Sequence, residues 1–109
     1  MTDCIPVVLF TYKRRDVLER TLAGLRENHV PLIIVYSDAN KNERDRQGVA
    51  SVRDLLSEIN WCEIERHDRT ENWGLGRNIL AGVSEALERF ESVLVWEDDL
   101  ACVPGTYDY

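Results

Sequence analysis

The sequence predicts an α/β fold in which a four-stranded parallel sheet carries helices on both faces. Three short apolar runs and one run of alternating apolar and charged residues are separated by three segments whose apolar residues recur at helical spacing, and the connections are short. Such alternation is typical of parallel sheets, because each crossover helix returns the chain to the same end of the sheet. The 109 residues, 44% of them hydrophobic and 30% charged, suffice for one core, so we expect a single domain over residues 1–109.

The first half of the chain contains two predicted strands with a helix between them. Residues 5–10, IPVVLF, are apolar and rich in β-branched side chains, which is typical of a strand buried on both faces. Asp16 and Glu19 match a capping box, which predicts a helix that starts there and continues to Asn28. Residues 31–37, PLIIVYS, form the second strand, with a proline at its first position, where a missing N–H is tolerated.

The second half contains two further helices and two further strands. After a polar loop, apolar residues between Val49 and Ile59 form one helical stripe. Residues 62–68, CEIERHD, alternate apolar and charged side chains, as expected of an edge strand. The glycine-containing loop 69–78 precedes a third amphipathic helix, and residues 92–96, SVLVW, form the fourth strand. The apolar residues expected to face the core from the third helix are Ile79, Leu80, Val83, Ala86, Leu87 and Phe90.

Composition and charge narrow the class of protein. The formal net charge is −7 and the isoelectric point is near 4.8, so a phosphate backbone would be repelled and nucleic acid is not expected as a partner. No apolar run approaches the roughly 20 residues of a membrane-spanning helix, and the N-terminus lacks the features of a signal peptide. We therefore expect a cytoplasmic location, or the soluble part of something longer. Cys4, Cys62 and Cys102 form neither a CxxC motif nor a cysteine–histidine cluster, which argues against a zinc site and a disulfide framework.

Polar side chains follow each of the four predicted strands. The carboxyl ends of parallel strands meet at one edge of a sheet, and ligands of such sheets bind at that edge. We therefore expect these residues to lie on one rim, which is the first indication of a functional site. They are Thr11, Tyr12, Lys13 and Arg14 after the first strand, Ser37 and Asp38 after the second, His67, Asp68 and Arg69 after the third, and Glu97, Asp98 and Asp99 after the fourth.

Three successive carboxylates, Glu97, Asp98 and Asp99, follow the last apolar strand. Mutual repulsion raises the free-energy cost of ionising all three unless a cation or hydrogen bonds accompany them. Carboxylate oxygens suit Mg²⁺ or Mn²⁺, which bind through one or two carboxylates together with substrate phosphates and stabilise a diphosphate as a leaving group. An isolated EDD is more often a solvated acidic turn. Here the apolar strand before it and the basic residues Lys13 and Arg14 on the same rim favour a metal site.

Other chemistries have less support in the sequence. The segment GLGRNILAG has Ile79 where a dinucleotide fingerprint requires its third glycine, and it follows the third strand rather than the first. Neither a P-loop nor a GxSxG elbow is present. His29 and His67 are given no catalytic role, and catalytic residues remain unassigned. A phosphotransfer receiver carries its acidic pair after the first strand, where this chain has TYKR.

Four segments of the chain together resemble a known enzyme family. IPVVLFTYKRRDVLERTLAGL, PLIIVYSDANKNE, NWGLGRNILAGVSEAL and VLVWEDDLACVPGTYDY are similar, in this order, to the nucleotide-diphospho-sugar transferases of the GT-A fold. The similarity is greatest to the N-acetylglucosaminyltransferase I-like branch, with the family-2 glycosyltransferases as broader cousins. It covers almost the whole chain and is most specific in PVVLFTYKR and VLVWEDDL. The resemblance implies a Rossmann-like three-layer sandwich, with the sheet in the strand order 3-2-1-4.

The resemblance also implies roles around a nucleotide-diphospho-sugar, with a UDP-sugar as the first expectation. Asp38 would contact the base, and Arg77 and Asn78, which open the third helix, would lie beside the nucleotide pocket. Each position also has a plainer interpretation as surface charge, as the start of a turn, or as the polar face of a helix. The loop residues that would face the base and ribose are Thr11, Tyr12, Lys13 and Arg14.

The resemblance implies that the acidic motif contacts both the ribose and the metal ion. Glu97 and Asp98 would take the ribose side, and Asp99 would hold the Mn²⁺ or Mg²⁺ ion that bridges the two phosphates. This division agrees with the chemistry. The metal ion would compensate the charge of one carboxylate, and hydrogen bonds from sugar hydroxyls would stabilise the others, so the three would not be bare charges.

The chain departs from the family in its length. Members carry a second half with further strands, the acceptor site and, in inverting enzymes, a carboxylate that acts as general base, whereas this chain ends at Tyr109. We therefore expect the donor half only, with little or no sugar transfer by this polypeptide alone. The alternative is a non-catalytic nucleotide- or metal-binding half-domain that acts in assembly or regulation. The fourth strand would lie at an open edge with no charge before Glu97, so a homo-oligomer through this strand is a further expectation.

Overall fold

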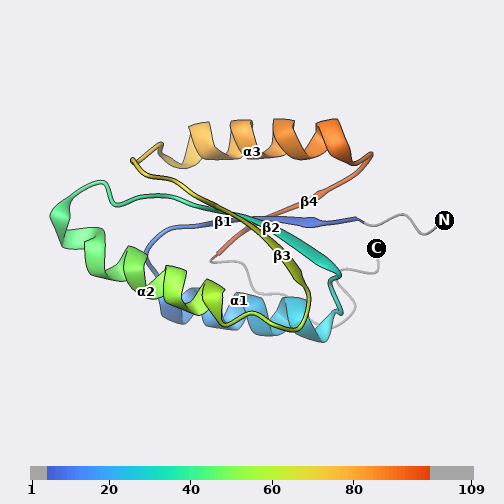
Figure 1. Ribbon diagram of the computed structural model, residues 1–109, viewed down its shortest axis with the longest axis horizontal. Helices are drawn as coiled ribbons and strands as arrows, with labels where there is room; N and C mark the ends of the chain where they lie inside the picture. The colour runs from blue at the N-terminus through green and yellow to red at the C-terminus, as the bar shows by residue number, and fades with distance from the viewer. Residues whose placement is uncertain (1–4, 99–109) are drawn as a thin grey trace.

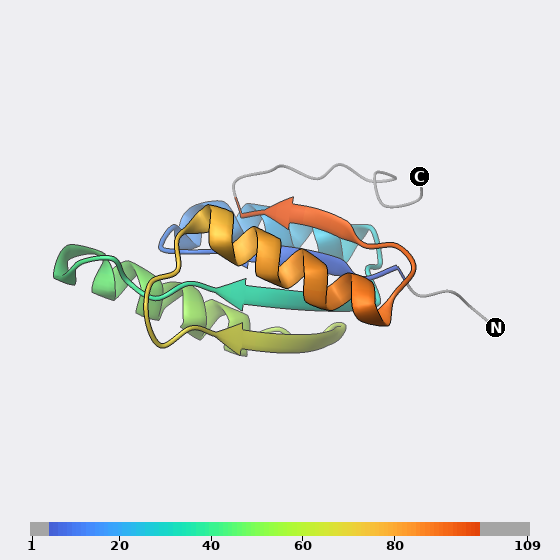
Figure 2. The ribbon, with the colours of Figure 1, turned by 90° about the horizontal axis from the view of Figure 1, so that it is seen from above.

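Residues 5–98, the part of the chain that the computed structural model describes, form a parallel sheet with helices on both faces (Figure 1). The strand order is β3-β2-β1-β4 and all three strand pairs are parallel, which confirms the predicted α/β class and sheet order. Figure 2 shows β3 and β4 at the two edges of the sheet. The elements are β1 (Val7–Thr11), α1 (Arg15–Glu27), β2 (Leu32–Ser37), the 3₁₀ helix η1 (Glu43–Asp45), α2 (Arg46–Ser57), β3 (Glu63–Asp68), α3 (Leu75–Arg89) and β4 (Leu94–Glu97).

The two central strands are apolar because both of their faces are covered. Figure 1 shows α3 on one face of the sheet and α1 with α2 on the other. Successive side chains of a strand point to opposite faces, so Val7 and Leu9 of β1 belong to the core beneath α1 and α2, whereas Val8 and Phe10 belong to the core beneath α3. The apolar runs of β1 and β2 therefore read as strands buried on both faces, as predicted.

Two predicted helix starts are wrong. Helix α1 begins at Arg15, and its N-cap residue Arg14 makes no side-chain capping hydrogen bond, so Asp16 and Glu19 form no capping box. Asp16 instead lies in the first turn, where its negative charge interacts favourably with the helix dipole. Helix α3 begins at Leu75, so the last part of the predicted loop 69–78 is helical.

The apolar stripe predicted for α3 is wrong at two positions. Leu80 and Leu87 are 72% and 50% exposed, whereas Asn78, Gly82 and Ala86 are buried against the sheet. The helix lies so close to the sheet that a Cβ atom at Gly82 would be 2.8 Å from the Tyr36 ring and 2.9 Å from the Phe10 ring. Small side chains at the contact thus bring α3 down onto β1 and β2.

The charged edge strand β3 is joined to α3 by an ion pair between Glu65 and Arg89. The Tyr36 ring of β2 stacks between Phe10 and His67, with centroid distances of 5.5 and 4.5 Å. Glu65 accepts a hydrogen bond from Arg89 of α3 at 2.7 Å and lies 2.9 Å from His67 Nε2. The hydrogen bonds from Arg89 and His67 lower the pKa of Glu65 to about 2. This polar network ends the sheet on the β3 side.

Candidate functional site

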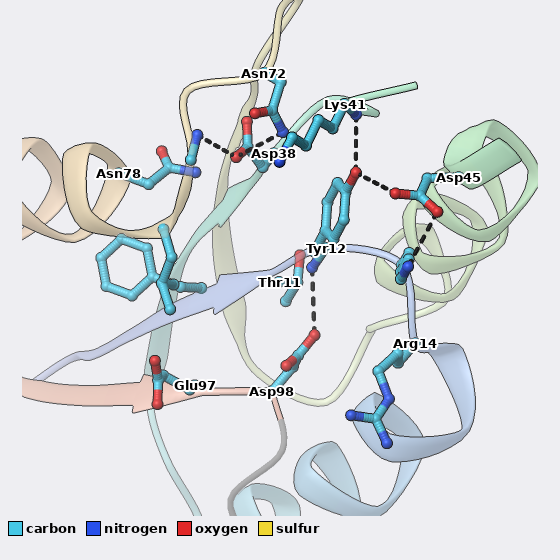
Figure 3. A pocket seen from close by; sticks show the side chains of 14 residues that line it. Thr11, Tyr12, Arg14, Asp38, Lys41, Asp45, Asn72, Asn78, Glu97 and Asp98 are labelled. Carbon is cyan, nitrogen blue, oxygen red and sulfur yellow. Dashed lines mark hydrogen bonds and ion pairs between the residues drawn. The ribbon is translucent and has the colours of Figure 1, made fainter. Parts of the chain in front are cut away.

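A cavity of about 520 Å³ lies at the carboxyl ends of β1, β2 and β4, below the first turn of α3 (Figure 3). This is the edge at which parallel sheets bind ligands, and the volume is within the usual range for small-molecule sites. Of the residues within 5–98 to which the resemblance assigns a role at the nucleotide, all but Arg77 line it. The other residues predicted on the same rim do not line it: Ser37, His67, Asp68 and Arg69. The lining residues are Phe10, Thr11, Tyr12, Lys13, Arg14, Asp38, Lys41, Asp45, Asn72, Gly74, Leu75, Asn78, Glu97 and Asp98.

One wall of the cavity is a contact between the loop after β1 and the loop after β2. The Tyr12 hydroxyl donates to Asp45 Oδ2 at 2.7 Å and accepts from the Lys41 N–H at 2.8 Å. Lys13 Nζ lies 3.0 Å from Asp45 Oδ1. Hydrogen bonds from Tyr12 and Lys13 lower the pKa of Asp45, whereas burial raises the pKa of Tyr12. Arg14 also lines the cavity, and its exposed side chain makes no hydrogen bond within residues 5–98.

The acidic end of β4 is connected to the same β1 loop. The Asp98 N–H donates to the Phe10 carbonyl at 3.1 Å, and Asp98 Oδ2 accepts from the Tyr12 N–H at 3.3 Å. Thr21 of α1 donates to the Asp98 carbonyl at 2.7 Å. Glu97 lines the cavity, and its carboxylate has no hydrogen-bond partner or ion-pair partner in the described part of the chain. Asp98 is thus tethered, while Glu97 is available to a ligand.

The predicted metal ligand Asp99 lies outside the described residues, so its role stays a prediction. Within residues 5–98, no group of three or more histidine, cysteine, aspartate or glutamate residues could hold a metal ion. Mg²⁺ and Mn²⁺ need only one or two protein carboxylates when phosphate and water oxygens complete their coordination. The available carboxylate of Glu97 beside the cavity fits that kind of site.

Asp38 lies at the cavity, but its carboxylate is already occupied by the protein. Oδ1 accepts from the N–H groups of Ala39 and Trp73, each at 2.9 Å. Oδ2 accepts from the Gly74 N–H at 2.9 Å and from Asn72 Nδ2 at 3.3 Å. Asp38 is only 5% exposed. It therefore fastens the end of β2 to the loop before α3, up to Gly74, the residue that precedes the helix.

Arg77 and Asn78 are neighbours in sequence but differ in position. Arg77 does not line the cavity, since its guanidinium stacks 4.0 Å from the centroid of the Trp73 ring. Asn78 lines the cavity, is 2% exposed, and accepts a hydrogen bond from Arg69 Nε at 3.0 Å. Sequence reasoning missed the lining residues Lys41, Asp45 and Asn72, because each belongs to a polar stretch of the sequence and gains its position from a contact distant in sequence.

The chain has no match among protein-family models, curated proteins or solved structures. No helix formed by residues 5–98 is long and apolar enough to cross a bilayer. Cys62 is a half-buried free thiol whose pKa is raised by burial, and Cys4 and Cys102 lie outside the described residues.

Proposed function

We propose that this domain binds the nucleotide-diphosphate part of a sugar donor, such as a UDP-sugar, with Mn²⁺ or Mg²⁺ held at the acidic end of β4. The observation that carries the proposal is the cavity at the carboxyl edge of the sheet, where the loop after β1 meets the acidic residues of β4. The backbone of Tyr12 and the side chain of Asp98 are in direct contact there. This contact between the two most specific segments of the family resemblance supports the proposal.

The charges around the cavity explain why a cation belongs in the complex. The lining contains three basic side chains and four acidic ones, and the Lys13–Asp45 pair neutralises one of each. A diphosphate would therefore meet a net negative wall unless a divalent ion accompanied it. Bound between the phosphates and the β4 carboxylates, that ion would neutralise the diphosphate. Arg14 is available to donate hydrogen bonds to ligand oxygens, since its guanidinium has no side-chain partner within residues 5–98.

Calorimetric titration with UDP tests this proposal, with and without Mn²⁺. We expect binding that requires the metal, and at least a tenfold loss of affinity, about 1.4 kcal/mol, in Asp99→Ala and in Glu97→Ala. Asp54→Ala removes an exposed carboxylate of α2 that does not line the cavity, so it serves as the matched control and should bind as the wild type does. Metal-independent binding of equal strength would remove the metal from the proposal, and no binding at all would reject the donor site.

We also propose that the chain self-associates through the edge strand β4. The N–H groups of Leu94 and Asp98 point to β1, so by alternation those of Val95 and Glu97 point away from the described sheet. The opposite edge strand β3 carries Glu63, Glu65 and Arg66, which protect it against pairing. Val95 is 43% exposed, and Val95→Lys should abolish self-association in sedimentation velocity. A wild-type chain that stays monomeric at high concentration contradicts the idea.

A further inference from the structure

Asn78 presents only one end of its amide to the cavity. Its Oδ1 accepts from Arg69 Nε at 3.0 Å, and because a guanidinium only donates, the oxygen of the amide must face Arg69. The amide nitrogen is then the end turned away from Arg69, and it makes no hydrogen bond to any residue in 5–98. Figure 3 shows the Asn78 side chain extending from α3 toward the cavity, beside Asp38. Asn78 is only 2% exposed, and its amide nitrogen is a free hydrogen-bond donor at the cavity.

Arg69 is held firmly enough to keep the amide from turning over. Its guanidinium lies 5.0 Å from the Tyr36 ring centroid and 3.6 Å from that of Trp73. Its backbone N–H donates to the Ser37 carbonyl at 2.8 Å, and its own carbonyl accepts from Arg53 at 2.8 Å. Stacking and backbone contacts therefore fix Arg69 independently of Asn78.

Arg77 completes this stack from outside. Its guanidinium lies 4.0 Å from the centroid of the same Trp73 ring that Arg69 contacts. The order from the cavity outward is Asn78, Arg69, Trp73 and Arg77. The resemblance placed Arg77 beside the nucleotide pocket together with Asn78, but Arg77 reaches Asn78 only through Trp73 and Arg69.

We propose that Asn78 determines specificity at this site, and that Arg69 is the residue that positions it. The fixed amide nitrogen selects a ligand oxygen that can accept a hydrogen bond and rejects a ligand N–H group at the same point. This inference rests on the proposed function and adds to it the chemistry of the ligand atom. A site with a buried, oriented polar group discriminates strongly because the wrong ligand leaves that group unpaired.

The accepting oxygen has two possible sources in a nucleoside diphosphate. One is a base carbonyl, as at C4 of uracil, where cytosine carries an amino group instead. The other is a phosphate oxygen, which UDP and CDP share. Comparing these two nucleotides in the presence of Mn²⁺ separates the sources.

Asn78→Asp is the variant that tests the proposal. The new carboxylate keeps an oxygen for Arg69 Nε but replaces the donor at the cavity with an acceptor. If the oxygen belongs to the base, the wild type should prefer UDP over CDP by about tenfold and Asn78→Asp should reverse the preference. If it belongs to a phosphate, the variant should bind both nucleotides about tenfold more weakly or worse, because two negative groups then meet. Asn40→Asp adds the same charge outside the cavity lining and should change neither affinity.

A second variant addresses the positioning role. Arg69→Lys removes the Nε donor, so the amide can rotate and offer either end to the ligand. Affinity for the preferred nucleotide should fall, and for a base contact the UDP to CDP ratio should approach one. Thermal melting and far-UV circular dichroism show whether each variant is folded.

The outcomes separate the inference from the function on which it rests. A wild type that binds neither UDP nor CDP overturns both. A wild type that binds UDP with Mn²⁺, together with a folded Asn78→Asp that keeps the wild-type affinities for both nucleotides, overturns the inference and leaves the proposed function intact. If Asn78→Asp fails to fold, unchanged affinities for both nucleotides in Arg69→Lys have the same consequence.

Discussion

Replacing Asp38 with alanine should lower the free energy of unfolding by about 3 kcal/mol, the largest effect we expect from a single side chain at the site. The carboxylate accepts four hydrogen bonds, three of them from backbone N–H groups in the segments 39 and 73–74. Hydrogen bonds to a charged group contribute about 1.5–3 kcal/mol each, but bonds that share one carboxylate are not additive. Alanine leaves the N–H groups of Trp73 and Gly74 without an acceptor. Urea unfolding followed by circular dichroism measures the loss.

Two further variants make the Asp38 result specific. An asparagine side chain would keep one oxygen at this position, but its amide nitrogen would face two donors, so Asp38→Asn should lose about half as much as alanine. Asp54→Ala, the exposed control on α2, should stay within about 0.5 kcal/mol of the wild type. Wild-type stability in Asp38→Ala would show that the carboxylate does not hold the loop. Asp38→Ala could also lose nucleotide binding without any lost base contact, because Asp38 holds Asn72 and Gly74, which line the cavity.

The strands could be predicted from sequence because local composition determines them. The apolar runs of β1 and β2 are buried throughout, and the alternating charges of β3 identify an edge strand. The start of α3 could not be predicted in this way. The loop that leads into it is held by Asp38, which lies 36 residues before Gly74 in the chain and reaches it only through the fold. Gly74 has a positive φ of 81°, which glycine adopts readily, and the helix begins at the next residue.

For the candidate site, the sequence predicted which residues meet but not which of their polar groups are free to bind a ligand. The rule that the strands of a parallel sheet end on one rim brought Thr11, Tyr12, Asp38, Glu97 and Asp98 together, and the structure places all of them around the cavity. The residues that the same rule added from the end of β3 do not line the cavity. Which of their polar groups is available to a ligand depends on partners distant in sequence. Asp38 is saturated by the 72–74 segment, whereas the Glu97 carboxylate has no partner within residues 5–98. No local pattern distinguishes these two carboxylates.

Helix periodicity located the core face of α3 only approximately, for a related reason. A stripe of large apolar residues was expected, but Gly82 and Ala86 make the close contact, and Leu80 and Leu87 are exposed. The contact requires small residues because the aromatic rings of Phe10 and Tyr36 rise from the sheet beneath it. Periodicity alone ranks a glycine as a poor core residue, although it is the residue that allows this packing.

Gly82→Val should therefore lower the free energy of unfolding by about 3 kcal/mol, even though valine forms helices better than glycine. The first added carbon would lie 2.8 Å from Tyr36 and 2.9 Å from Phe10. Neither ring can move aside easily. Tyr36 is stacked between Phe10 and His67, and its hydroxyl donates to Glu85 of α3 at 3.2 Å. The helix must instead lift from the sheet and lose contacts along the core beneath it.

Gly76 offers the matched control on the same helix. A Cβ atom there meets nothing within 4 Å, so Gly76→Ala should raise the free energy of unfolding by about 0.5 kcal/mol through helix propensity alone. Gly82→Ala gains the same propensity but must still displace a ring, so we expect a net loss of about 1 kcal/mol. Opposite signs for one substitution at two positions six residues apart separate packing from propensity. Equal gains at both positions in urea unfolding would mean that α3 does not approach β1 and β2 as closely as these contacts require.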